Sequence, residues 1–121
     1  MECLPVQKLP TGGGWLYEIK LDGWRLESVK TGGKVMLYSR RAKSFNTQFR
    51  EIADVLNYLP DETVIEGEVV AIDENGRPNF NLLQNFRSAC ANLLYFAFDV
   101  LIHTGQDLTR LPLSPRREVL A

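Results

Sequence analysis

A run of ten residues, 93–102, is apolar at every position except Asp99, and it restricts the fold more than any other feature of the sequence. The run is long enough for a buried strand and too rich in aromatic residues to be typical of a short helix. Three more stretches are strand-like in composition: 15–22, 24–30 and 63–73. The turn at 31–34, which contains Gly32 and Gly33, leads to 35–39, so we expect an antiparallel hairpin there.

One segment between these strands has helical periodicity. Its apolar residues recur three and four positions apart: Phe49, Ile52, Ala53, Leu56 and Leu59. Asn46 or Thr47 is the expected N-cap, and Pro60 ends the run. We expect a short helix at 79–87 and a last helix that starts at Ser114 and Pro115. Strands and helices mix without regular β-α-β alternation, which predicts an α+β fold with mainly antiparallel sheets and flanking helices.

The composition is that of one small globular domain. Of the 121 residues, 45% are hydrophobic and 24% are charged, and a Pro- and Gly-containing lead-in segment, 1–14, precedes the domain at 15–121. The formal net charge of −1 argues against a protein that binds nucleic acid by overall charge alone. No apolar run is long enough to span a bilayer and no signal peptide is recognisable, so we expect no membrane partner.

The two cysteines, Cys3 and Cys90, are far apart in the sequence. Their spacing fits neither a disulfide framework nor a zinc site. We therefore expect reduced thiols in a cytoplasmic protein. We also expect a monomer.

The stretch 15–25 places charges within a strand-like pattern. Period-two alternation puts three charged side chains on one face and three apolar ones on the other: Glu18, Lys20 and Asp22 against Tyr17, Ile19 and Leu21. A lysine between two acids that faces a cleft is a candidate nucleophile. The alternative is a solvated edge strand with a ladder of charges.

The strand predicted at 63–73 carries two acids on one face, Glu66 and Glu68, beside aliphatic residues. Carboxylates are costly to bury unless a partner or a cation satisfies them. One interpretation is an edge strand whose acids reach water. The other is the wall of a cleft, where an acid meets a metal ion, a ribose hydroxyl or Lys20.

In the apolar run, alternation puts Leu94, Phe96, Phe98 and Val100 on one face. Such a stripe usually packs in a core, but a ring at the edge of a pocket can stack on a purine. Asp99 then faces the other way, and we expect it to be a structural acid that accepts hydrogen bonds from a neighbouring loop.

Four segments resemble, in order, the motifs of the ATP-dependent DNA ligases. Lys-Leu-Asp-Gly-Trp-Arg at 20–25 is similar to the Lys-x-Asp-Gly-x-Arg motif of the covalent nucleotidyltransferases, and Ser-Arg-Arg-Ala at 39–42 to Ser-Arg-x-Gly. Glu-Gly-Glu at 66–68 resembles Asp-Gly-Glu, and 95–101 resembles the family's Phe-x-x-Phe-Asp-x-Leu type of motif. The sequence between the motifs is similar to that of the bacterial ligases of non-homologous end joining.

The resemblance covers nearly everything from Trp15 onward, with two mild departures. Ala42 stands where these ligases commonly have Gly, and Glu66 stands where they have Asp. The resemblance implies that the chain is part of an ATP-grasp-like adenylation domain. The family's Glu-Gly-x-x-x-Lys and Lys-x-Lys motifs and its OB-fold domain do not follow in this sequence, so we expect weak or absent self-adenylation of the chain alone.

The resemblance also implies roles for individual residues. Lys20 would form a lysyl-AMP phosphoramidate with ATP, Glu18 would lie against the adenine edge, and Phe98 would stack on the adenine. Arg25 would contact the sugar or a phosphate, and Arg40 a phosphate of the nucleotide or of DNA. Glu68 would hold the ribose hydroxyls or, together with Asp22, a metal ion, Mg²⁺ or Mn²⁺.

The implied reaction is DNA repair by nick sealing. AMP would pass from Lys20 to a 5′-phosphate of nicked or broken double-stranded DNA, and the adjacent 3′-hydroxyl would then attack. RNA ligase or mRNA-capping guanylyltransferase chemistry is the alternative within the enzymes. A non-catalytic nucleotide-binding fragment is the alternative of another class.

Overall fold

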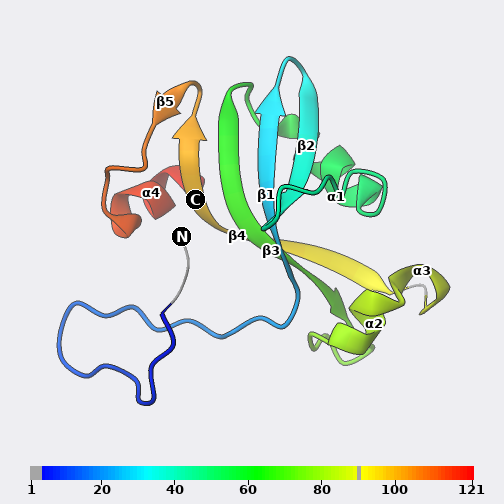
Figure 1. Ribbon diagram of the computed structural model, residues 1–121, viewed down its shortest axis with the longest axis horizontal. Helices are drawn as coiled ribbons and strands as arrows, with labels where there is room; N and C mark the ends of the chain where they lie inside the picture. Colours follow the sequence, from blue (N-terminus) through cyan, green and yellow to red (C-terminus); the bar gives the residue numbers. More distant parts are fainter. Residues whose placement is uncertain (1–3, 90) are drawn as a thin grey trace.

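Four of the five strands form where the sequence is strand-like, and they make one antiparallel sheet (Figure 1). They are β1 (Trp24–Thr31), β2 (Lys34–Ser39), β3 (Thr63–Ile72) and β4 (Asn92–His103), and a two-residue β5 (Gln106–Asp107) follows. The strand order is β2-β1-β3-β4-β5. This computed structural model describes residues 4–89 and 91–121, and it confirms the predicted α+β class. Because β3 lies at the centre of the sheet, the edge-strand interpretation of its two acids is wrong.

The helices are short and lie beside this sheet. They are α1 (Arg50–Val55), the 3-10 turn η1 (Leu56–Tyr58), α2 (Phe80–Gln84), α3 (Phe86–Ala89) and α4 (Leu113–Leu120). The predicted helix after Asn46 therefore begins later than expected, with Phe49 as its N-cap. Asn46 does not cap the helix but bonds to β2: its side chain accepts a hydrogen bond from the Leu37 N–H (2.8 Å) and donates one to the Val35 carbonyl (2.6 Å). It thereby satisfies part of the free edge of β2.

Residues 15–22 form no strand, contrary to the prediction. They belong to an irregular arm, residues 4–22, which lies outside the sheet and leads into β1 (blue in Figure 1). Both sides of β1 are already paired, with β2 and β3, so no strand edge is available to the arm there. Tyr17 and Ile19, which the alternation placed on an apolar face, are exposed.

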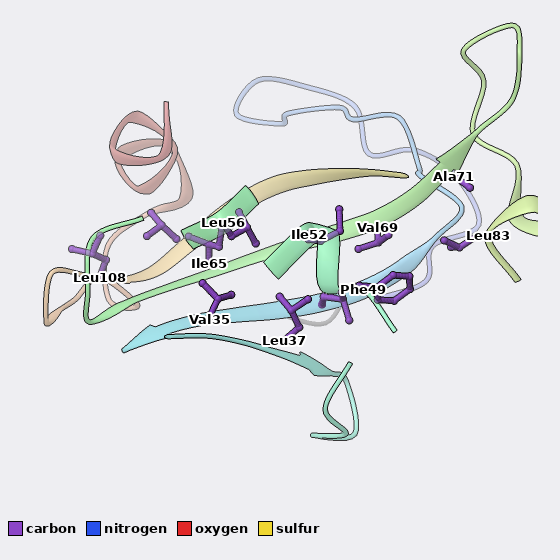
Figure 2. Close-up of a cluster of buried hydrophobic side chains, with 12 residues drawn as sticks. Val35, Leu37, Phe49, Ile52, Leu56, Ile65, Val69, Ala71, Leu83 and Leu108 are labelled. Atoms are coloured by element: carbon purple, nitrogen blue, oxygen red, sulfur yellow. The ribbon is translucent and has the colours of Figure 1, made fainter. Parts of the chain in front are cut away.

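The core lies between one face of the sheet and the segment that carries α1 and η1 (Figure 2). Phe49 is completely buried and packs between Trp24, Phe45 and Phe86, with ring centroids 5.4–5.6 Å apart. Aromatic pairs at this separation add to the stabilisation that burial provides. This packing fixes the start of β1, where the candidate site begins.

Two further sequence expectations concern the cysteines and membrane-spanning segments. Cys3 and Cys90 both lie outside the described residues. Within 4–89 and 91–121, no helix has the length and apolar character needed to cross a membrane.

Candidate functional site

Three neighbouring strands place charged and aromatic side chains in rows on the face opposite the core. Arg25 of β1 is paired with Glu68 of β3, which is paired with Phe96 of β4. In the next row Glu66 is paired with Asp99. Cross-strand partners lie on the same face of a sheet, so these residues share one surface.

A bulge in β4 brings Asp99 onto the same surface as Phe98. The register shifts between Glu66 and Gly67, so that Gly67 is paired with Ala97 and Glu66 with Asp99, and Phe98 is the extra residue. The predicted alternation along β4 therefore holds as far as Phe98, which lies on the face of Phe96 as expected, and is wrong from Asp99 onward. Asp99 joins the face of Glu66, and Val100 turns into the core.

Arg25 connects two of these side chains. Its Nη2 donates to Oε2 of Glu66 at 2.7 Å, and its guanidinium carbon lies 5.3 Å from the centroid of the Phe98 ring. Planar guanidinium groups suit both kinds of contact. Arg25, Glu66 and Phe98 thus form one contiguous group across β1, β3 and β4.

Gly23 fastens the lysine segment to β3. Its N–H donates to Oε1 of Glu68 at 2.9 Å. A Cβ added at Gly23 would stand 2.1 Å from the Val69 carbonyl oxygen, so only glycine allows this approach. Since a chain spans at most about 3.6 Å per residue, the Cα of Lys20 lies within about 11 Å of that of Gly23.

The side chains of the arm are less restricted than those of the strands. Lys20 and Asp22 are exposed, and Glu18 forms an ion pair with Nη1 of Arg117 on α4. Among the described residues no hydrogen bond joins Lys20 to Glu68 or Phe98. No three His, Cys, Asp or Glu side chains in this part of the chain are grouped to hold a metal ion. The metal roles of Asp22 and Glu68 stay predictions.

Gly67, the middle residue of Glu-Gly-Glu, makes room for Tyr95. A Cβ there would lie 2.5 Å from the Tyr95 ring and 2.6 Å from the Phe96 carbonyl oxygen. The Tyr95 hydroxyl passes this point to donate to the Leu26 carbonyl (3.1 Å) and to accept from Ser28 (3.1 Å). Glycine between the two acids therefore lets β4 be tied to β1 across β3.

Asp99 is fully buried and accepts two hydrogen bonds from Arg116, at 2.7 and 2.8 Å. It is a structural acid, as expected, although its donor lies on α4 and not on a loop. The core interpretation of the aromatic stripe is wrong for Leu94 and Phe96, which are 41% and 42% exposed. Exposed apolar side chains beside paired charges are typical of a binding face.

A hollow of about 620 Å³ opens where the chain enters β1 and leaves β2. Its lining combines four cationic side chains with two aromatic ones: Arg25, Arg40, Arg41 and Lys43, with Trp24 and Phe45. The hollow brings together two predicted site residues, Arg25 and Arg40. Its concentration of positive charge favours an anionic ligand.

Some residues of this surface were not predicted from the sequence. Two ion pairs, Arg25 with Glu66 and Arg117 with Glu18, join segments that are remote in the chain, so no local pattern indicates them. Arg41 and Lys43 gave a local signal, because they follow Arg40 in a run of basic residues.

Comparison with known proteins agrees with this geometry. Residues 6–121 match the family model described as "ATP dependent DNA ligase domain". The multifunctional non-homologous end joining protein LigD of Pseudomonas aeruginosa is 38% identical over 96% of the chain, and a DNA ligase of Methanococcus aeolicus is 35% identical over 86%.

A solved structure, mycobacterial DNA ligase D complexed with ATP and MES, superimposes on 85% of the chain with a TM-score of 0.76 and 31% identity. The chain spans only part of each protein: 14% of the Pseudomonas relative, 20% of the Methanococcus relative and 34% of the mycobacterial chain.

Proposed function

Because this chain belongs to the ATP-dependent DNA ligase domain family, we propose that it supplies the nucleophile and the nucleotide-binding face of a ligase that seals DNA strand breaks with ATP. The observation that carries the proposal is the bond from the Gly23 N–H to Glu68. It connects the segment of Lys20 directly to the strand that bears both acids. The exposed ring of Phe96 lies on the next strand.

Lys20 is the proposed nucleophile. Its amine is reactive only when neutral, so it loses its proton before it attacks the α-phosphate of ATP. A nitrogen–phosphorus bond forms, the bond from the α-phosphate to the bridging oxygen breaks, and pyrophosphate leaves. The product is AMP on Lys20.

The neighbouring residues bind and orient the nucleotide. Glu18 would accept a hydrogen bond from the adenine edge, Phe98 would stack on the base, and Glu68 would accept from the ribose hydroxyls. Arg25 and Arg40, which share the basic hollow, would bind the sugar or phosphates of the nucleotide or of DNA. AMP then passes to a DNA 5′-phosphate, and attack by the adjacent 3′-hydroxyl releases it and closes the strand.

A divalent cation, Mg²⁺ or Mn²⁺, fits the donors available. Asp22 directly precedes Gly23, whose N–H donates to Glu68, and magnesium is usually held by one or two carboxylates together with phosphate oxygens. When bound, such a cation would neutralise negative charge on the phosphates of ATP. We propose a monomeric protein of the cytoplasm that acts on nicked or broken duplex DNA in end joining.

Transfer of labelled AMP tests this function. The full-length gene product is incubated with ATP labelled at the α-phosphate and Mg²⁺, and covalent label on the protein is measured. The wild type and Lys8→Ala, which alters an exposed lysine of the same arm, are expected to be labelled, while Lys20→Ala stays unlabelled.

Three outcomes contradict the assignment. Label that persists in Lys20→Ala would remove Lys20 as the nucleophile. A wild type that binds ATP without acquiring label would favour a non-catalytic nucleotide-binding protein, and labelling from GTP in preference to ATP would favour capping chemistry.

A further inference from the structure

We propose that Arg117 is a positioning residue that holds the arm carrying Lys20 against the sheet; the catalytic consequence, but not the docking itself, rests on the function proposed above. Nη1 of Arg117 pairs with Oε1 of Glu18, and Nε donates to the Phe98 carbonyl at 3.1 Å. One side chain of α4 thus joins the arm to β4.

These contacts complete a two-point attachment of the lysine segment. Glu18 is held by Arg117 on one side of Lys20, and Gly23 is held by Glu68 on the other. Lys20 lies between two fixed points five residues apart in the sequence. An irregular segment held at both ends has fewer conformations than one held at a single end, so its lysine is presented in a narrower range of positions.

The geometry leaves Glu18 able to bind a ligand. Within residues 4–89 and 91–121, its carboxylate pairs with Arg117 through Oε1, and a carboxylate has a second acceptor oxygen. Arg117 also contacts the backbone of Phe98, the residue proposed to stack on the base. It therefore sets the spacing between the two groups that would contact the adenine.

The ion pair is partly exposed, since the side chains of Arg117 and Glu18 keep 27% and 54% of their accessible surface. Pairs of this kind contribute at most about 1 kcal/mol, which corresponds to about a fivefold change in a rate or an equilibrium. Salt screens them, because the Debye length falls to about 3 Å at about 1 M ionic strength. Arg117 is charged at all accessible pH values, and the bond to Glu18 raises its pKa further above the ordinary value.

The docking is tested by a double-mutant cycle on the ¹⁵N-labelled 121-residue chain, with Glu18→Gln, Arg117→Gln and the double variant. The measurement is the heteronuclear ¹⁵N NOE of the amides of residues 19–21. Each single variant is expected to lower it, and the double variant no further than either single one. Glu18→Gln leaves the Arg117 bond to Phe98 in place, so its effect reports the arm alone.

Arg110→Gln is the matched control, because Arg110 is an exposed arginine of the segment before α4. It is expected to leave the NOE of the arm unchanged, whereas about 1 M NaCl lowers it in the wild type as the variants do. Additive effects of the two substitutions, or an arm whose NOE is the same in Glu18→Gln as in the wild type, would overturn the proposal.

The catalytic consequence is measured separately, as the rate of AMP transfer to Lys20 in the full-length gene product at saturating ATP. Arg117→Gln is expected to slow it by up to about fivefold at low salt, and the difference from the wild type is expected to shrink at high salt. If the NOE cycle succeeds and the wild type acquires no AMP, the proposed function fails while the docking stands. If labelling occurs at equal rates in both proteins, the positioning role fails while the function stands.

Discussion

Single residues explain two details of the ligase-like motifs in this chain. Gly23 and Gly67 are required because a Cβ at either position would overlap neighbouring backbone, at Val69 and Phe96 respectively. In the sequence, the two glycines stand out only because their motifs resemble those of the DNA ligases. The close approaches of the backbone that require glycine are visible only in the structure. Ala42 is the reverse case, since it occupies a position where related ligases commonly have glycine.

Ala42 has a φ of 56°, in the left-handed region that favours glycine. Its side chain is exposed, so little packing is lost on its removal. Ala42→Gly is expected to raise the free energy of unfolding by about 0.5–1 kcal/mol, measured by urea denaturation. Ala53→Gly, within α1, is the control and is expected to lower it by about 1 kcal/mol. A destabilised Ala42→Gly would show that the turn is not strained.

At the scale of elements, the strands were predictable because period-two alternation and apolar runs reflect the faces of a sheet. The failures have physical reasons that depend on tertiary structure. Residues 15–22 have strand-like composition, but both sides of β1, the strand that they lead into, are already paired, and Asn46 bonds to the edge of β2 where a helix start was expected. The bulge at Phe98 reverses the faces of Asp99 and Val100, and no local pattern indicates it.

The link between β4 and β1 through Tyr95 predicts a dependence of stability on pH. Burial raises the pKa of Tyr95 from 10.0 to about 12. The unfolded chain therefore loses this proton at lower pH than the folded chain does, so the contribution is complete below pH 10 and is lost as pH rises toward 12. The loss corresponds to about 2–3 kcal/mol over this range.

Tyr95→Phe is expected to be less stable by about 1–2 kcal/mol at neutral pH, because two hydrogen bonds are lost, but to lose less stability on going to alkaline pH. Urea denaturation at about pH 8 and about pH 11 measures both effects. Tyr58→Phe, at a 79% exposed residue, serves as the control and should keep the wild-type pH dependence. Equal slopes in wild type and Tyr95→Phe would contradict the assignment.

For the whole molecule, the sequence predicted the class of fold and the family, whereas the assembly of the site depends on long-range contacts. Glu68 meets the lysine segment through Gly23, and Glu18 meets Arg117 from the other end of the chain. Both contacts join segments that only the order of strands and the docking of α4 bring together. The central claim is that residues from the arm, β3 and β4 surround one adenylate.

Chemical-shift mapping of ATP binding to the ¹⁵N-labelled chain tests this claim most directly. The account predicts that the amides that respond to ATP lie in three groups: residues 18–25, residues 66–68 and residues 96–98. A second hollow, of about 610 Å³ between β2 and α1 and lined by residues such as Lys34 and Arg50, offers a rival location on the same molecule. Shift changes confined to that hollow, or to only one of the three groups, would contradict the account.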